Sequence, residues 1–271
     1  MEWHVTEGGI IAPVSLFSPE ESFLCGQSFR FLPEKDGFLG TVGHRRVHIS
    51  VSDGLLHIRG AAIADAPFWE QYLALDEDYA AFQNRLARNP ILRQAVAFAP
   101  GIRVLRQPFF ETLITFIISQ NNNIPRIRGI VERLCALAGE ECGGFYSFPT
   151  PERLAALKEE DLAPLRAGWR SAYLLDAARL VALGRVDERE LMSLPTDLAR
   201  ERLMEIKGVG PKVADCVLLF ACHRLEVCPM DVWMKRAMAL YFPRGFPAYL
   251  RPIAGVAQQY LFHWARSRSI G

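Results

Sequence analysis

The chain has 271 residues, of which 50% are hydrophobic and 23% are charged, a composition that excludes a disordered, collagen-like or coiled-coil protein. Thirty-one Lys and Arg residues against 30 Asp and Glu residues give a formal net charge of +1, so the molecule as a whole does not attract a polyanion. A nucleic-acid partner would therefore have to be bound by a local patch of cations and backbone amides.

The sequence also narrows the expected location of the protein. No run approaches the roughly 18 consecutive apolar residues of a membrane span, and the N-terminus lacks the basic segment and apolar core of a secretion signal. Six irregularly spaced cysteines in a chain of this length are typical of reduced thiols. We therefore expect a cytoplasmic protein, nucleoid-associated if its source is prokaryotic, with no membrane partner.

The first quarter of the sequence has the alternating periodicity of β-strands. Val47, Ile49 and Val51 alternate with polar residues, so three apolar side chains share one face. Two Asp-Gly pairs are typical of hairpin turns, and they separate three expected strands at about 38–42, 46–51 and 55–58. The pattern predicts an antiparallel sheet with one buried face.

From about residue 61 the period of the apolar residues becomes helical. Tyr79, Phe82 and Leu86 lie three and four positions apart, and similar spacing downstream predicts about eight to ten helices with no internal repeat. Gly184 is typical of a residue that ends a helix, here one that begins at about Arg170. A short sheet followed by many helices predicts an α+β protein.

We expect the N-terminal antiparallel β-sheet domain to span residues 1–65 and a larger all-α body to span 66–271. Within the body, residues 198–222 have the pattern of a helix-hairpin-helix, with a tight glycine turn and a proline at the start of the second helix.

The turn of this hairpin is formed by Gly208, Val209 and Gly210, which leave much of the backbone free of side chains. Bare backbone amides and the free N–H groups of the following helix make a seat for a phosphate group. A G-x-G sequence alone is weak support, but its position between two helices predicts contact with the DNA backbone.

Lys212 lies in the first turn of the second helix, where the helix dipole disfavours a cation. The residue is either a solvated lysine that contacts phosphate or a nucleophile whose amine is freed by the positive helix end. Asp231, in the sequence Cys228-Pro-Met-Asp-Val-Trp233, is expected at the N-cap of the next helix. Beside Lys212 its carboxylate could also balance a positive charge that develops on a sugar.

The segments Gly-Val-Gly-Pro-Lys-Val-Ala-Asp-Cys (208–216) and Pro-Met-Asp-Val-Trp (229–233) resemble the helix-hairpin-helix superfamily of DNA glycosylases. More specifically, they resemble its bifunctional 8-oxoguanine DNA glycosylase/AP-lyase branch, and the segments 119–135 and 26–30 agree. The resemblance runs from about residue 26 to residue 262.

This resemblance implies an enzyme that removes 8-oxoguanine opposite cytosine from duplex DNA by flipping the base out of the helix. Lys212 would attack the sugar C1′ and form a Schiff base, β-elimination would then cut the strand, and Asp231 would stabilise the cationic sugar. We expect a monomer with no organic cofactor and no metal. No cysteine follows Cys228, so the four-cysteine iron–sulfur loop that some relatives have near the C-terminus is not expected.

Four residues would bind the extruded base according to the resemblance. The main-chain carbonyl of Gly26 would accept a hydrogen bond from N7–H, which the lesion carries and guanine lacks. Cys216 and Phe262 would pack against the base, and Gln258 would bond its Watson–Crick edge. In isolation, the thiol and the phenyl ring would be interpreted as core residues and the glycine as a turn residue.

Four further residues match positions that hold the duplex open or read the widowed cytosine. These are Asn121, Arg126 and Arg170, together with Trp169 in the place of a tyrosine wedge. Arginine donors can satisfy the cytosine acceptors N3 and O2, which are exposed once the pair is broken. Trp233 lies where relatives commonly have a phosphate-binding histidine, and its indole can donate only one hydrogen bond.

Two alternatives remain at this point. A monofunctional alkylpurine DNA glycosylase of the same fold would generally lack the amine of Lys212. A non-catalytic helix-hairpin-helix DNA-binding protein would not need Lys212, Asp231, Gln258 and Phe262 in one chain.

Overall fold

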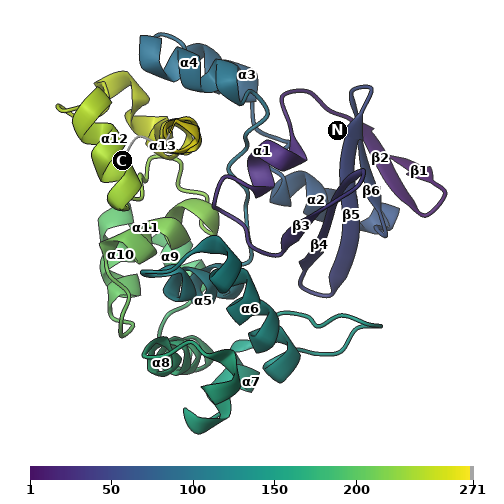
Figure 1. Cartoon of the computed structure of the whole chain (residues 1–271), viewed down its shortest axis with the longest axis vertical. Coiled ribbons are helices and arrows are strands. Elements are labelled where there is room, and N and C mark those ends of the chain that lie inside the picture. The colour runs from purple at the N-terminus through teal and green to yellow at the C-terminus, as the bar shows by residue number, and fades with distance from the viewer. Residues whose placement is uncertain (269–271) are drawn as a thin grey trace.

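A six-stranded antiparallel sheet and a larger helical body make up the protein, whose computed structural model describes residues 1–268 (Figure 1). The sheet has the order β1-β2-β6-β5-β4-β3. Its strands are β1 (His4–Thr6), β2 (Gly9–Pro13), β3 (Phe31–Glu34), β4 (Gly37–Val42), β5 (Arg45–Ser52) and β6 (Leu55–Arg59). The α+β fold class and the three central strands are confirmed. The sequence does not predict β1 and β3, because β1 has only exposed side chains and β3 contains a proline.

One face of the sheet is buried under two short helices, α1 (Pro19–Phe23) and α2 (Ala66–Tyr72). Phe23 of α1 stacks on Phe31 with a distance of 3.9 Å between ring centroids, and Trp69 of α2 is fully buried. This core continues to Leu75 and includes Leu105, so it extends past the domain division expected at residue 65, which stays a prediction.

The helical body follows α2 along the chain. Its α-helices are α3 (Tyr79–Leu86), α4 (Pro90–Phe98), α5 (Phe109–Ser119), α6 (Ile124–Ala138), α7 (Pro151–Ala155), α8 (Arg170–Ala182), α9 (Glu188–Ser193), α10 (Thr196–Met204), α11 (Pro211–Phe220), α12 (Val232–Tyr241) and α13 (Ala254–Ser267). Three 3-10 helices span Ile63–Asp65, Glu160–Leu165 and Ala248–Ile253.

The expected count of about eight to ten helices is too low, because twelve α-helices, α2 to α13, follow the sheet within residues 1–268. Helices of one or two turns, such as α7 and α9, are too short to show a helical period in the sequence. The expected end of α8 is confirmed, because Gly184 follows the helix with a positive φ of 65°. None of the helices within residues 1–268 is both long and apolar enough to cross a membrane.

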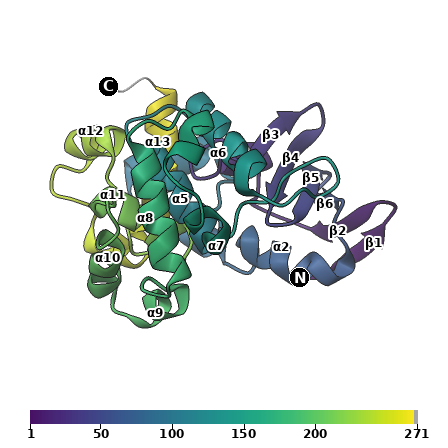
Figure 2. The same cartoon turned by 90° about the horizontal axis from the view of Figure 1, so that it is seen from below.

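The two regions are joined at several points. Seen from below, the sheet and the helices lie side by side, and the segment between α6 and α7 reaches toward the sheet (Figure 2). Within that segment, the carbonyl groups of Gly144 and Tyr146 accept hydrogen bonds from Arg46 and Arg30, at 3.3 and 2.6 Å. Arg30 directly precedes β3, and its side chain is only 5% exposed.

The C-terminal helix α13 is tied to the N-terminal part of the chain. Gln259 donates a hydrogen bond to the Cys25 sulfur at 3.1 Å, and the Tyr260 hydroxyl donates to the Ile102 carbonyl at 3.1 Å. Residues near both ends of the chain are thereby held next to each other.

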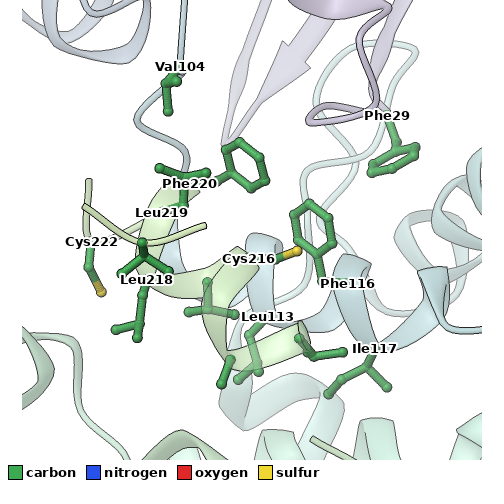
Figure 3. Packing of buried hydrophobic residues seen from close by; sticks show 14 of the residues in the cluster. Phe29, Val104, Leu113, Phe116, Ile117, Cys216, Leu218, Leu219, Phe220 and Cys222 are labelled. Carbon is green, nitrogen blue, oxygen red and sulfur yellow. The ribbon is translucent and has the colours of Figure 1, made fainter. Parts of the chain in front are cut away.

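The centre of the body is formed by α5 packed against α11. Leu113 and Ile117 of α5 are fully buried there, as are Leu218 and Leu219 of α11. In Figure 3 the sulfur of Cys216 on α11 points toward the Phe116 ring on α5. The two helices that carry this core also carry the candidate site.

Candidate active site

One side of the site is a helix-hairpin-helix motif, which occupies the region expected to contain it, at about residues 198–222. Helix α10 leads into the turn and α11 leaves it, with Gly210 at the N-cap and Pro211 at the first helical position. Gly208 has a φ of 82°, and a Cβ there would overlap the Tyr173 ring, so this position requires glycine. No heavy atom lies within 4 Å of a Cβ built at Gly210, so the helix N-terminus is open.

The amide groups of this turn are not equivalent. The N–H of Val209 donates to the Ile206 carbonyl at 3.0 Å, and the Val209 side chain is buried. Gly210 and the first turn of α11 therefore offer the exposed part of the phosphate seat.

Lys212 extends from the first turn of α11 toward α5. Its Nζ donates a hydrogen bond to the Ser119 hydroxyl at 3.4 Å and lies 5.1 Å from the centroid of the Phe116 ring. No carboxylate within residues 1–268 forms an ion pair with this amine. The amine is thus held by a neutral hydroxyl and an aromatic ring rather than by a partner of opposite charge.

Asp231 occupies the N-cap of α12, as expected. Its Oδ1 accepts a hydrogen bond from the N–H of Met234 at 2.7 Å. The second carboxylate oxygen is not engaged by any residue of the described chain. Capping and a role in chemistry are therefore compatible, because each uses a different oxygen.

Two adjoining cavities meet at this pair of residues. The wider cavity has a volume of about 680 Å³ and includes Asn121 and Trp169 in its lining. The narrower one, of about 300 Å³, includes Gly26 and Phe262. Both cavities are lined by Ser119, Asn122, Lys212, Asp231 and Trp233. Gly26 and Phe262 thus line one of the two cavities that share Lys212 and Asp231, and Asn121 and Trp169 line the other.

In the narrower cavity, Gly26 approaches the Phe262 ring closely. A Cβ built at Gly26 would lie 3.4 Å from Cε1 of Phe262, and the φ of Gly26 is +88°. A side chain there would be strained by the backbone, and its Cβ would be in van der Waals contact with the ring.

The other two predicted base-binding residues, Cys216 and Gln258, are not among the residues that line this cavity. Burial raises the pKa of the Cys216 thiol to about 11, so the group is a neutral packing surface at physiological pH. Gln258 on α13 is 5% exposed, and its Oε1 has no hydrogen-bond partner within residues 1–268. An unpaired buried acceptor is costly unless a ligand satisfies it.

At the wider cavity, Trp169 and Asn121 are exposed, and Asn121 has a positive φ of 47°. Arg170 is buried, and its guanidinium donates to the carbonyl groups of Ala167, Gln120 and Asn121. It holds the loop that carries Asn121, and it lies 4.3 Å from the Trp169 ring centroid. Its donors are therefore engaged by the protein, and a role in reading cytosine stays a prediction.

Arg126 lies near the same loop but on its exposed side. Its backbone N–H donates to the Asn123 side chain at 3.0 Å, and its guanidinium donates weakly to the Arg166 carbonyl at 3.4 Å. This side chain could exchange its long hydrogen bond for one to a base.

Sequence reasoning does not single out four further side chains of the site, which are Phe29, Phe116, Ser119 and Arg266. The two phenylalanines resemble core residues, and Ser119 lies in an apolar helix where only its position beside Lys212 gives it importance. For Arg266 the only available signal is its spacing of four residues after Phe262.

Two family profiles together match most of the chain. The profile for the 8-oxoguanine DNA glycosylase N-terminal domain matches residues 10–113. The profile for HhH-GPD superfamily base excision DNA repair proteins matches residues 114–245.

Solved structures are similar over the full length. One is the Clostridium acetobutylicum 8-oxoguanine glycosylase/lyase with dsDNA containing cytosine opposite 8-oxoG, which is 32% identical with a TM-score of 0.92. That match covers 100% of this chain and 99% of that chain. Another is MBOgg1 in complex with a low-affinity DNA ligand, at 37% identity, a TM-score of 0.92 and 99% coverage of both chains.

Similarity to curated sequences is more partial. The Saccharomyces cerevisiae N-glycosylase/DNA lyase is 39% identical over 152 residues, which is 50% of this chain and 40% of the yeast protein. The chain spans between 40% and 64% of the length of the first curated relatives that it matches. Because both solved structures are matched almost from end to end, the chain belongs to the 8-oxoguanine DNA glycosylases of the HhH-GPD superfamily of base-excision DNA repair proteins.

Proposed function

We propose that this protein removes 8-oxoguanine opposite cytosine from duplex DNA and then cleaves the strand at the abasic site. The observation that carries the proposal is the position of Lys212 and Asp231 at the junction of the two cavities. A nucleotide extruded into the narrower cavity would present its sugar at this junction, while the opened duplex would lie at the wider cavity.

The amine of Lys212 attacks C1′, and the glycosidic bond to N9 breaks with its electron pair leaving on the base. The bond from C1′ to the ring oxygen O4′ then breaks, O4′ takes a proton, and a protonated Schiff base forms. This Schiff base acidifies the proton on C2′, and removal of that proton expels the 3′ phosphate by β-elimination. The free oxygen of Asp231 faces the positive charge that develops on the sugar and stabilises it. No organic cofactor or metal enters this sequence of steps.

Recognition of the base is assigned to the narrower cavity. The Gly26 carbonyl accepts a hydrogen bond from N7–H, Phe262 and Cys216 pack against the base, and Gln258 bonds the Watson–Crick edge, which requires the cavity to open as far as Cys216 and Gln258 when the base enters. The unpaired Oε1 of Gln258 and the absence of a Cβ at Gly26 support these roles.

Reading of the opposite strand is assigned to the wider cavity. Trp169 fills the vacated stack, Asn121 and Arg126 contact the widowed cytosine, and Arg170 contacts it or holds the loop that does. Gly208, Val209 and Gly210 form the turn that seats the DNA backbone. We infer that the protein acts as a monomer in the cytoplasm, or on the nucleoid in a prokaryote.

Borohydride trapping on a duplex with one 8-oxoguanine opposite cytosine tests the proposal. The wild-type protein should form a covalent protein–DNA adduct, because borohydride reduces the imine to a stable amine. Lys212→Gln should bind the same duplex and form no adduct. Trapping by Lys212→Gln at the wild-type level would make another amine the nucleophile, and an unreactive wild-type protein would favour one of the two alternatives.

A further inference from the structure

We propose that Arg266, at the end of α13, binds a phosphate of the extruded nucleotide at the mouth of the narrower cavity. This inference rests on the proposed function, because it assumes that a nucleotide enters that cavity. It adds a residue to the site that neither the helix-hairpin-helix nor the base-reading set contains.

Arg266 lies in the wall of the narrower cavity. It lines the narrower cavity together with Lys212, Asp231 and Phe262. Its Nη1 lies 3.8 Å from a Cβ built at Gly26, and its guanidinium carbon lies 5.9 Å from the centroid of the Phe262 ring. The guanidinium therefore lies beside the residues to which the base is assigned.

The Arg266 guanidinium has no hydrogen-bond or ion-pair partner in the described part of the protein. Within residues 1–268, Arg266 forms no ion pair and donates no side-chain hydrogen bond, although Asp231 lines the same cavity. Other arginines near the site are engaged, as Arg170 is by three carbonyl groups. A guanidinium has five fixed donors and no acceptor, so this one is available to an anion.

Exposure decides between a phosphate and the base as the partner. Arg266 is exposed, whereas the walls of the cavity near it, Phe29 and Gly26, are buried or half-buried. A flipped base is enclosed by the pocket, while its phosphates stay at the rim in contact with water. The exposed Arg266 guanidinium at the rim is therefore placed to donate two parallel hydrogen bonds to the oxygens of a phosphate group.

The same helix end provides a matched control. Arg268 is also exposed, and its guanidinium packs 4.6 Å from the Trp264 ring centroid, outside the linings of both cavities. Replacing Arg268 removes the same charge from the same region without removing the proposed contact. A general electrostatic effect on DNA binding would act on both residues alike.

The experiment measures the Kd for a duplex with a tetrahydrofuran abasic analogue opposite cytosine, over a series of salt concentrations. Arg266→Ala should raise Kd about tenfold and reduce the slope of log K against log salt by about 0.9, since one phosphate contact is lost. Arg266→Lys should recover most of the affinity because a point charge still binds phosphate. Arg268→Ala should resemble the wild type, and Kd for an undamaged duplex should not change in any variant.

Equal effects of Arg266→Ala and Arg268→Ala would overturn the proposal. So would a variant that binds the abasic duplex normally but excises 8-oxoguanine slowly, because Arg266 would then contact the base. The abasic analogue needs no base removal, so a failure of the proposed glycosylase activity would appear in the wild-type protein on 8-oxoguanine and leave this comparison intact.

Discussion

At the scale of single residues, Gly26 shows how one missing side chain shapes the site. Its φ of +88° lies in the left-handed region, and a Cβ there would reach van der Waals contact with the Phe262 ring at 3.4 Å. The left-handed conformation costs a residue other than glycine about 1–2 kcal/mol. Glycine is therefore favoured by the backbone conformation, and a methyl group would take up space beside the ring on which the base is proposed to stack.

We predict that Gly26→Ala slows 8-oxoguanine removal about five- to 150-fold, the range that corresponds to losing one buried hydrogen bond. Cleavage at a preformed abasic site should stay near the wild-type rate, because that step needs Lys212 and no base. Single-turnover assays on the two substrates provide the comparison. Equal loss of both activities would mean that Gly26 supports the fold and not recognition.

At the scale of elements, the hairpin between α10 and α11 contains two glycines with different tasks. Gly208 packs against Tyr173 and has a positive φ, whereas Gly210 has an extended backbone and open space in front of it. The first glycine keeps the two helices together, and the second leaves the N-terminus of α11 accessible to a phosphate.

We predict that Gly208→Ala lowers the free energy of unfolding by about 1–3 kcal/mol, as overpacking of a core does. Gly210→Ala should change it by less than about 0.5 kcal/mol, as at an ordinary surface position. Gly210→Ala should nevertheless weaken DNA binding, because its methyl group occupies the approach to the helix end. Urea unfolding and a binding assay on undamaged duplex separate the two effects, and a normal affinity of Gly210→Ala would remove the phosphate seat from the hairpin.

The elements also show what can be predicted from the sequence. The hairpin, the caps at Gly210 and Asp231 and the central strands follow from local patterns, and the structure has all of them. The two cavities do not follow from local patterns, because they depend on how α5, α11 and α13 pack. Ser119 and Arg266 could not be found for that reason, and neither could the engagement of Arg170 by loop carbonyls.

At the scale of the whole molecule, a cluster of charged groups lies where the sheet meets the helices. Glu111 of α5 is half-buried near Arg30, and burial raises the pKa of its carboxyl group to about 7, although the Arg30 guanidinium acts in the opposite direction. The unfolded chain gives up this proton near pH 4.5, so the folded protein binds more protons between these values. Glu111 therefore makes the free energy of unfolding fall as the pH rises from about 4.5 to about 7.

We predict that Glu111→Gln flattens this dependence, so its stability relative to the wild type rises across that interval by at most about 1.4 kcal/mol per pH unit. Urea unfolding at several pH values between 5 and 8 gives the difference curve. Glu132→Gln, which removes an exposed carboxylate 3.8 Å from Arg30, should leave most of the dependence, because burial raises the pKa of Glu111 more than Glu132 does. A constant difference between Glu111→Gln and the wild type would contradict the assignment.

The contact between Gly26 and Phe262 joins residues near opposite ends of the chain. During synthesis, the wall that holds Gly26 emerges first and must wait for almost the entire polypeptide before α13 arrives. Closure of the narrower cavity is one of the most distant encounters along the chain, because Gly26 belongs to its N-terminal part and Phe262 and Arg266 belong to α13. We expect a chain that lacks α13 to have no lesion pocket, so the pocket is complete only when nearly the whole polypeptide has been made.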